Sequence, residues 1–142
     1  MEQSLDPGVF EILIVDNCST DETRQVVADM MSSYEGHMRY VYEENQGLSF
    51  SRNRAIQEAR GEIVSFLDDD ATASPDWLRT ILLCFMNVSP RPAVVGGPVR
   101  LKWEVPRPDW CVGEIGTLLF AETDYGDSPL WLEAPKGPAG AN

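Results

Sequence analysis

The sequence is poor in positive charge, in cysteine and histidine, and in long apolar runs. Its formal net charge of −12 disfavours binding to a nucleic acid, because a polyphosphate is bound through basic side chains. Cys18, Cys84 and Cys111 are an odd number without C-x-x-C spacing, so neither a disulfide framework nor a zinc knuckle is supported, and a reducing cytoplasm fits. The single histidine, His37, precedes an expected strand and is interpreted as a surface residue.

Targeting signals are equally absent. The most apolar run, residues 81–88, is too short to cross a bilayer, and residues 1–8 lack the basic and apolar regions of a signal peptide. We therefore expect a cytoplasmic protein without a membrane segment. Because the chain is acidic, it is expected to bind an anionic ligand only where a metal ion or a local arginine reverses the field.

Short apolar runs and helical patterns alternate along the first 100 residues. This order predicts an α/β fold with a mostly parallel sheet, flanking helices and right-handed crossovers. Ser19 with Glu22 fits a capping box, and Ser74 with Pro75 fits an N-cap followed by the first helical residue. The expected strands are 11–16, 38–42, 62–67 and 93–99, and the expected helices run from Ser19 to Tyr34, from Ser49 or Ser51 to a C-cap at Gly61, and from Ser74 to Met86.

Acidic residues end two of these strands: Asp16 the first, and Asp68, Asp69 and Asp70 the third. In an open parallel sheet ligands bind beyond the carboxyl ends of strands, so both groups are expected at one site. Alternation along an extended backbone places Asp68 and Asp70 on one side, about 6 to 7 Å apart, and Asp69 on the other. Their repulsion, roughly 2 to 3 kcal/mol at a dielectric near 20, favours a divalent cation such as Mg²⁺ or Mn²⁺. The alternative is a solvated turn before the next helix.

Three stretches resemble successive motifs of the family 2 glycosyltransferases. They are VDNCSTDET at 15–23, ENQGLSFSRNRA at 44–55 and GEIVSFLDDDA at 61–71, in the order the family has them. The resemblance covers residues 10–100 well and implies a GT-A fold, a Rossmann-like nucleotide-diphospho-sugar transferase, here incomplete. It places the donor-binding portion in residues 1–100 and the start of an acceptor-binding portion in 101–142 of the same structural domain.

The resemblance implies a donor-binding role for several residues. Asp16 matches the acid that hydrogen-bonds the donor base, and a UDP-type donor is favoured because the ring N–H of uracil is a donor. Capping of the following turn is the alternative for this residue. Asn45, Gly47, Arg52 and Asn53 match the stretch that lines the donor site, where Arg52 approaches the base or diphosphate unless it is a helix-surface arginine.

Asp68 to Asp70 match the family's D-x-D motif, whose first two positions approach the ribose. Asp70, together with Asp68, is the expected site for Mg²⁺ or Mn²⁺. The metal would offset charge on the departing nucleoside diphosphate while a base deprotonates the hydroxyl of a saccharide or other acceptor, giving inversion. The catalytic base is unknown and is expected beyond this chain. By the resemblance, Asp109, Asp124 and Asp127 lie where the family recognises acceptors, among the tryptophans Trp103, Trp110 and Trp131, whose faces can stack on sugars. Core packing explains these tryptophans at least as well.

Family members open with a strand that is absent here and that lies between strands 11–16 and 62–67 in the family's sheet. Those two strands are therefore expected to pair directly, to borrow a strand, or to fold poorly, and exposed edges favour self-association. Two other function classes stay open: an inactive fragment acting as an interaction or oligomerisation module, and a nucleotidyltransferase, although its glycine-rich basic loop is absent. A calcium site at Asp16–Asp21 is weaker still, because the EF-hand alternation is missing.

Overall fold

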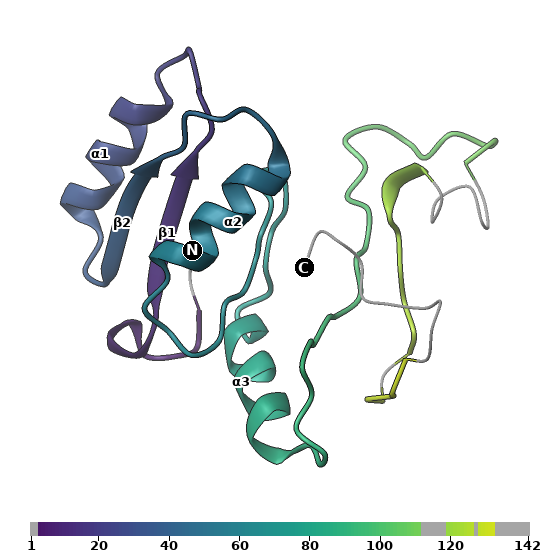
Figure 1. Cartoon of the computed structure of the whole chain (residues 1–142). Helices are drawn as coiled ribbons and strands as arrows, with labels where there is room; N and C mark the ends of the chain where they lie inside the picture. The colour runs from purple at the N-terminus through teal and green to yellow at the C-terminus, as the bar shows by residue number, and fades with distance from the viewer. Residues whose placement is uncertain (1–2, 112–118, 127, 133–142) are drawn as a thin grey trace. The chain divides into compact units, whose positions relative to one another are not determined.

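The computed structural model describes residues 3–111, 119–126 and 128–132. The chain divides into two compact units, and the boundary along the sequence lies between Val64 and Ser65. The first unit begins with a 3₁₀ turn (Pro7–Val9) and contains strands β1 (Glu11–Asp16) and β2 (His37–Tyr42) and helices α1 (Thr23–Ser33) and α2 (Leu48–Glu58) (Figure 1). β1 and β2 pair in parallel, from Glu11 opposite His37 to Asp16 opposite Tyr42. The α/β class, with a parallel sheet and flanking helices, is confirmed.

The two helices of this unit lie on opposite faces of the strand pair (Figure 1). Successive side chains of a strand point to opposite faces. Odd-numbered Glu11 and Arg39 share the α2 face, because Arg39 binds Glu58 at the end of α2. Even-numbered Asp16 faces α1, where the charge of Arg24 contributes to lowering its pKa. Residues on alternate positions of one strand therefore meet different helices, as in a doubly wound sheet.

The helix starts differ from the expected capping. α1 begins at Thr23, whose amide and hydroxyl both donate to the Asp21 carboxylate at 3.0 and 2.5 Å, so the capping box is wrong. α2 begins after Gly47, which has φ +138°, a conformation that L side chains rarely adopt. Its last helical residue is Glu58 and its C-cap is Ala59, so the expected C-cap at Gly61 is also wrong.

Burial in the first unit is concentrated at two side chains. Val27 of α1 is 5% exposed and packs as the apolar centre, and Asp16 is 5% exposed. The neighbouring α1 residues Val26 and Met30 are about half exposed, at 52% and 49%. A two-stranded sheet with helices buries little apolar surface, which is marginal for stability in isolation.

Two expected strands are not formed in the part of the chain that the structure describes. Residues 62–67 are bend and irregular backbone, and residues 93–99 contribute only one antiparallel bridge, Val99 to Thr123. A strand is stable when a neighbour takes up its backbone donors and acceptors. Among the described residues the sheet has two strands, so the apolar run at 62–67 has no ladder to join.

The second unit holds helix α3 (Trp77–Asn87), whose N-cap is Asp76 rather than the expected Ser74. Ser74 instead accepts the Trp77 amide through its backbone carbonyl at 3.1 Å. Farther along, Trp103 packs edge-on against Phe120 with ring centroids 5.8 Å apart. In the described ranges of both units, no helix is long and apolar enough to span a membrane.

Candidate functional site

Asp16 is a buried carboxylate at the carboxyl end of β1, where ligand sites form in parallel sheets. Its Oδ1 accepts the Ser19 amide at 2.8 Å and its Oδ2 accepts the Tyr40 hydroxyl at 2.5 Å. Hydrogen bonds from Ser19 and then from Tyr40 lower the pKa of Asp16, and they outweigh burial, which raises it. Asp16 caps the turn after β1, yet its two oxygens retain further acceptor positions for a ligand.

The loops after β1 and β2 are joined chiefly by the side chain of Asn17, with a contribution from Cys18. Its Nδ2 donates to the carbonyls of Glu43 at 3.1 Å and Asn45 at 2.6 Å, and its Oδ1 accepts the Gly47 amide at 2.6 Å. Cys18, with φ +63°, adds a thiol contact to the Glu43 carbonyl at 3.4 Å. Asn17 and Cys18 and the residues from Glu43 to Gly47, about 30 residues apart in the sequence, therefore form one rim beside Asp16.

Removing the Asn17 amide should release this rim. We expect Asn17→Ala to destabilise the first unit by about 1 to 2 kcal/mol, because three partly solvated hydrogen bonds are lost together. Urea unfolding measures the loss, and amide hydrogen exchange at Gly47 should quicken. Gln46→Ala, which removes an exposed amide from the same loop, is the matched control. Equal stability of the two variants would contradict the joining role of Asn17.

The structure places the expected donor stretch around the start of α2. The amide and side chain of Asn45 both donate to Glu43 Oε1 at 2.8 Å, and these two bonds lower the pKa of Glu43. Gly47 is the N-cap of α2 and is bound to Asn17, so two of the four expected residues lie in the rim beside Asp16. Arg52 and Asn53 lie within α2, half-buried and exposed respectively.

The acidic triplet forms a turn instead of continuing a strand. The Ala71 amide donates to the Asp68 carbonyl at 3.1 Å, with Asp69 and Asp70 as the central residues. The alternation that set Asp69 opposite Asp68 and Asp70 is therefore wrong, because it holds only for extended backbone. Asp68 is half-buried, and Asp69 and Asp70 are exposed.

The triplet fits a divalent cation in its donor chemistry. Mg²⁺ is usually held by one or two carboxylates and completes its coordination with water and phosphate oxygens. Exposed Asp70 and half-buried Asp68 can offer such oxygens, whereas no three acidic, histidine or cysteine side chains gather into a metal cage among the described residues. The set suits a cation bound together with a phosphate ligand.

Asp16 and the acidic triplet belong to different units, residues 2–64 and 65–142. The structure thus brings together Asp16, Asn45 and Gly47, all within the first unit. The shared site of Asp16 with Asp68–Asp70 stays a prediction.

The expected acceptor residues lie in the second unit. Trp110 and Trp131 are each 58% exposed, whereas Trp103 packs on Phe120 and under the Arg107 guanidinium. Trp103 is thus half-buried and the other two are exposed, and the acceptor role of all three stays a prediction. Asp124 pairs with Arg100 at 3.1 Å, Asp109 is exposed, and Asp127 lies outside the described residues.

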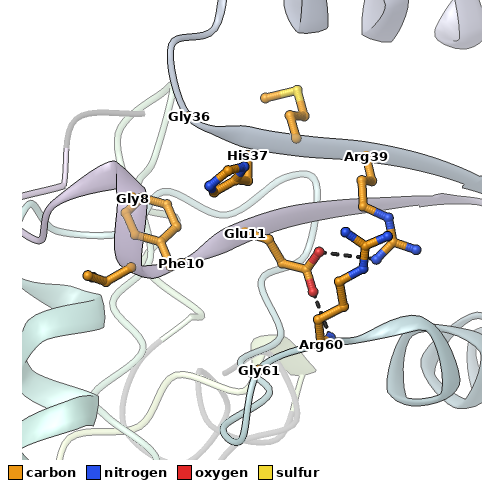
Figure 2. A pocket seen from close by; sticks show the side chains of 10 residues that line it. Gly8, Phe10, Glu11, Gly36, His37, Arg39, Arg60 and Gly61 are labelled. Carbon is orange, nitrogen blue, oxygen red and sulfur yellow. Dashed lines mark hydrogen bonds and ion pairs between the residues drawn. The ribbon is translucent and has the colours of Figure 1, made fainter.

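A hollow of about 490 Å³ lies at the amino ends of β1 and β2, the edge opposite Asp16 (Figure 2). Figure 2 shows Glu11 between Arg39 and Arg60. Arg39 binds Glu11 Oε2 at 3.1 Å, and the Arg60 amide donates to Oε1 at 2.7 Å. Burial raises the pKa of Glu11, but the bonds from Arg60 and Arg39 outweigh it and hold the pKa below its usual range. These bonds tie the end of α2 to both strands.

Arg39 is the centre of that tie, and its loss should destabilise the first unit. Its guanidinium bridges Glu11 and Glu58, so Arg39→Ala leaves two half-buried carboxylates without their shared cation. We expect a loss of about 2 kcal/mol in chemical denaturation, below the cost of breaking a fully buried pair. Arg54→Ala removes a more exposed partner of Glu58 and should cost about 0.5 kcal/mol or less. Similar losses for both variants would contradict the bridging role.

Sequence reasoning missed Asn17 and Tyr40, two residues that shape the site. Asn17 lies in the first motif, directly after Asp16. Its side-chain amide both donates and accepts hydrogen bonds, and this was a signal that polar partners lie close to it. Tyr40 required the register of β1 and β2, in which it lies opposite Ile14, on the same face as Asp16. His37, expected at the surface, is exposed at the amino edge.

The chain was compared with known proteins. The family model for glycosyl transferase family 2 matches residues 1–111. A glucosyl-dolichyl phosphate glucuronosyltransferase of Haloferax volcanii is 31% identical over 143 aligned residues, covering 100% of this chain and 44% of the relative. A putative teichuronic acid biosynthesis glycosyltransferase, TuaG, of Bacillus subtilis is 40% identical over 85 residues, covering 56% of this chain and 32% of the relative.

A third relative, the succinoglycan biosynthesis protein ExoM of Rhizobium meliloti, is 29% identical over 101 residues, covering 71% of this chain and 32% of the relative. No solved structure matches the chain. The chain thus spans less than half the length of these relatives. Because the family model covers most of the sequence, the chain belongs to glycosyl transferase family 2.

Proposed function

We propose that this chain binds the nucleotide-sugar donor in an inverting, metal-dependent glycosyltransferase. The observation that carries the proposal is Asp16, a buried carboxylate held at the carboxyl end of β1 beside the rim that Asn17 forms with Gly47. An ionised carboxylate is an acceptor only, which suits the ring N–H of a uracil base. UDP-type donors are therefore the proposed class.

The first unit also offers a site for the anionic part of a donor. The amino end of α2 follows Gly47 directly, and helix amino ends attract anions through free N–H groups and the helix dipole. Arg52 follows one turn later on the same helix. Together these groups would contribute, beside the cation, to the local positive field that an acidic protein needs to accept a diphosphate.

Asp70 and Asp68 would hold Mg²⁺ or Mn²⁺, which would stabilise charge on the nucleoside diphosphate as it leaves. The protein's own residues bind and orient the donor: Asp16 the base, and the start of α2 the phosphates. The acceptor is proposed to be the hydroxyl of a saccharide or similar compound. The relatives named for teichuronic acid and succinoglycan biosynthesis support a role in polysaccharide synthesis.

A transfer assay on the full-length protein tests this function. The protein is incubated with Mn²⁺ and a panel of UDP-, dTDP- and GDP-sugars, with oligosaccharides as acceptors, and nucleoside diphosphate release is followed. We expect release from a UDP-sugar, and inversion at the sugar carbon by NMR of the product. A folded protein that releases nucleoside diphosphate from none of these donors would favour the alternative, an interaction module without catalysis.

A further inference from the structure

The Tyr40 hydroxyl makes a short, charge-assisted contact with the site carboxylate. It donates to Asp16 Oδ2 at 2.5 Å, within the range for an O–H bond to an ionised carboxylate. The hydrogen bond to Asp16 raises the pKa of Tyr40, so the phenol keeps its proton and stays a donor. Tyr40 is thus a hydrogen-bond donor held against the ionised carboxylate of Asp16.

The parallel register explains why these two residues meet. Tyr40 lies opposite Ile14, and Asp16 follows Ile14 by two residues, so all three side chains share one face. A phenol is long enough to cover the diagonal between neighbouring strands. A leucine or valine at position 40 would fit the strand pattern but would leave Asp16 Oδ2 without this donor.

The charges around Asp16 favour its ionised form, although its burial opposes ionisation. Ser19 and Tyr40 donate hydrogen bonds, and Arg24 on α1 adds a positive charge. Tyr42 on β2 is engaged with Cys18, which raises the pKa of Tyr42 and leaves the phenol neutral at physiological pH. The titratable and charged groups that interact with Asp16 are Arg24, Asp21, Tyr40 and Tyr42.

We propose that Tyr40 is a positioning residue that sets base specificity, by holding Asp16 as a fixed, acceptor-only carboxylate. Such a group pairs with a base whose ring nitrogen carries hydrogen, as in uracil, thymine and guanine. It is mismatched with cytosine, whose corresponding ring nitrogen is itself an acceptor, and an unpaired polar contact is a strong basis for rejection. The proposal rests on the proposed donor-binding function and adds to it the residue that tunes Asp16.

The test compares Tyr40→Phe with wild type in the full-length protein, with Mn²⁺ present. Calorimetry should show UDP affinity falling about tenfold, because an Asp16 carboxylate that Tyr40 no longer holds loses its preorganisation for the base. Affinity for CDP should change less than about twofold, so the preference for UDP narrows. The ¹³C titration of the Asp16 carboxyl, without nucleotide, should show its pKa rising. Tyr34→Phe deletes the same hydroxyl from a phenol packed against Gly36 at the amino end of β2, and should behave as wild type.

The two readouts separate the inference from the function beneath it. If Tyr40→Phe matches Tyr34→Phe in both the carboxyl titration and the UDP to CDP ratio, the role of Tyr40 is overturned while UDP binding by wild type upholds the function. A raised carboxyl pKa with an unchanged ratio also overturns the specificity role. If wild type binds none of the nucleoside diphosphates, the proposed function fails and the inference fails with it.

Discussion

Asp70→Asn is expected to weaken Mn²⁺-dependent UDP binding by about 100-fold or more in the full-length protein. The substitution removes one of the few hard anionic ligands available to the cation, and a bound metal contributes several kcal/mol to interaction with phosphate oxygens. Isothermal titration with UDP at saturating Mn²⁺ measures the effect. Without the metal, wild type and variant should bind UDP equally weakly.

Asp69→Asn is the matched control for Asp70→Asn, since both residues are exposed and central in the same turn. We expect a smaller loss, because the family pattern directs this position toward the ribose. Because the chain turns at Asp68, strand alternation no longer places the carboxylates of Asp69 and Asp70 on opposite sides. Equal loss of metal-dependent binding in the two variants would contradict the assignment of Asp70 as the ligand.

Asp16→Asn is expected to lower UDP affinity by about 100-fold with little loss of fold. Asparagine keeps the shape of the side chain, but it has no charge and replaces one carboxylate oxygen by an N–H donor. A buried site built around a charged acceptor loses most of its discrimination when that acceptor is removed. Calorimetric titration measures the loss, and circular dichroism checks the fold.

Asp29→Asn, an exposed change on α1 whose carboxylate accepts a hydrogen bond from Gln25, serves as control and should bind UDP as wild type does. The folded pKa of Asp16 is lowered, so its charge is fully present above the ordinary aspartate pKa of about 3.9 and is lost as pH falls through the lower folded value. Wild-type UDP binding should therefore show no Asp16-dependent loss from neutral pH down to about pH 4. An Asp16→Asn variant that binds UDP within twofold of wild type would contradict the account.

The elements that the sequence predicted well are those whose signals are local. β1 and β2 appear as apolar runs of the expected length, and α1 and α2 follow as helical patterns, with boundaries shifted by one to four residues. Their parallel pairing followed from the strand–helix–strand order, because a helical crossover returns the chain in the same direction. α3 was also expected, three residues longer at its start.

The sequence predicted strands at 62–67 and 93–99 that are not formed among the described residues, because local pattern alone does not settle whether a strand forms. Val64 and Phe66 have strand propensity, but a strand also needs a partner along its edge, and that partner is set by the whole fold. In the described residues β1 pairs only with β2. The expected self-association through an open strand edge stays a prediction that light scattering can test.

The sequence pointed to the carboxylate of the site, Asp16, but not to the neighbouring residues that shape the site, Asn17 and Tyr40. Asp16 could be predicted because a charged residue at the end of an apolar strand indicates a structural or functional role. The roles of Asn17 and Tyr40 depend on which loop and which strand residue the fold brings beside Asp16. That information lies in the register of β1 and β2 rather than in any one segment. The capping role given to Ser19 was wrong, because its amide donates to Asp16 and the N-cap of α1 is Glu22.

Calorimetric titration of the full-length protein with UDP, with and without Mn²⁺, tests the central claim most directly. The account predicts saturable UDP binding that strengthens by about 100-fold or more when Mn²⁺ is added, because in an acidic protein the cation offsets the repulsion of the diphosphate. A folded protein that binds no UDP in the presence of Mn²⁺, or that binds it equally well without the metal, would contradict a metal-dependent nucleotide-sugar site.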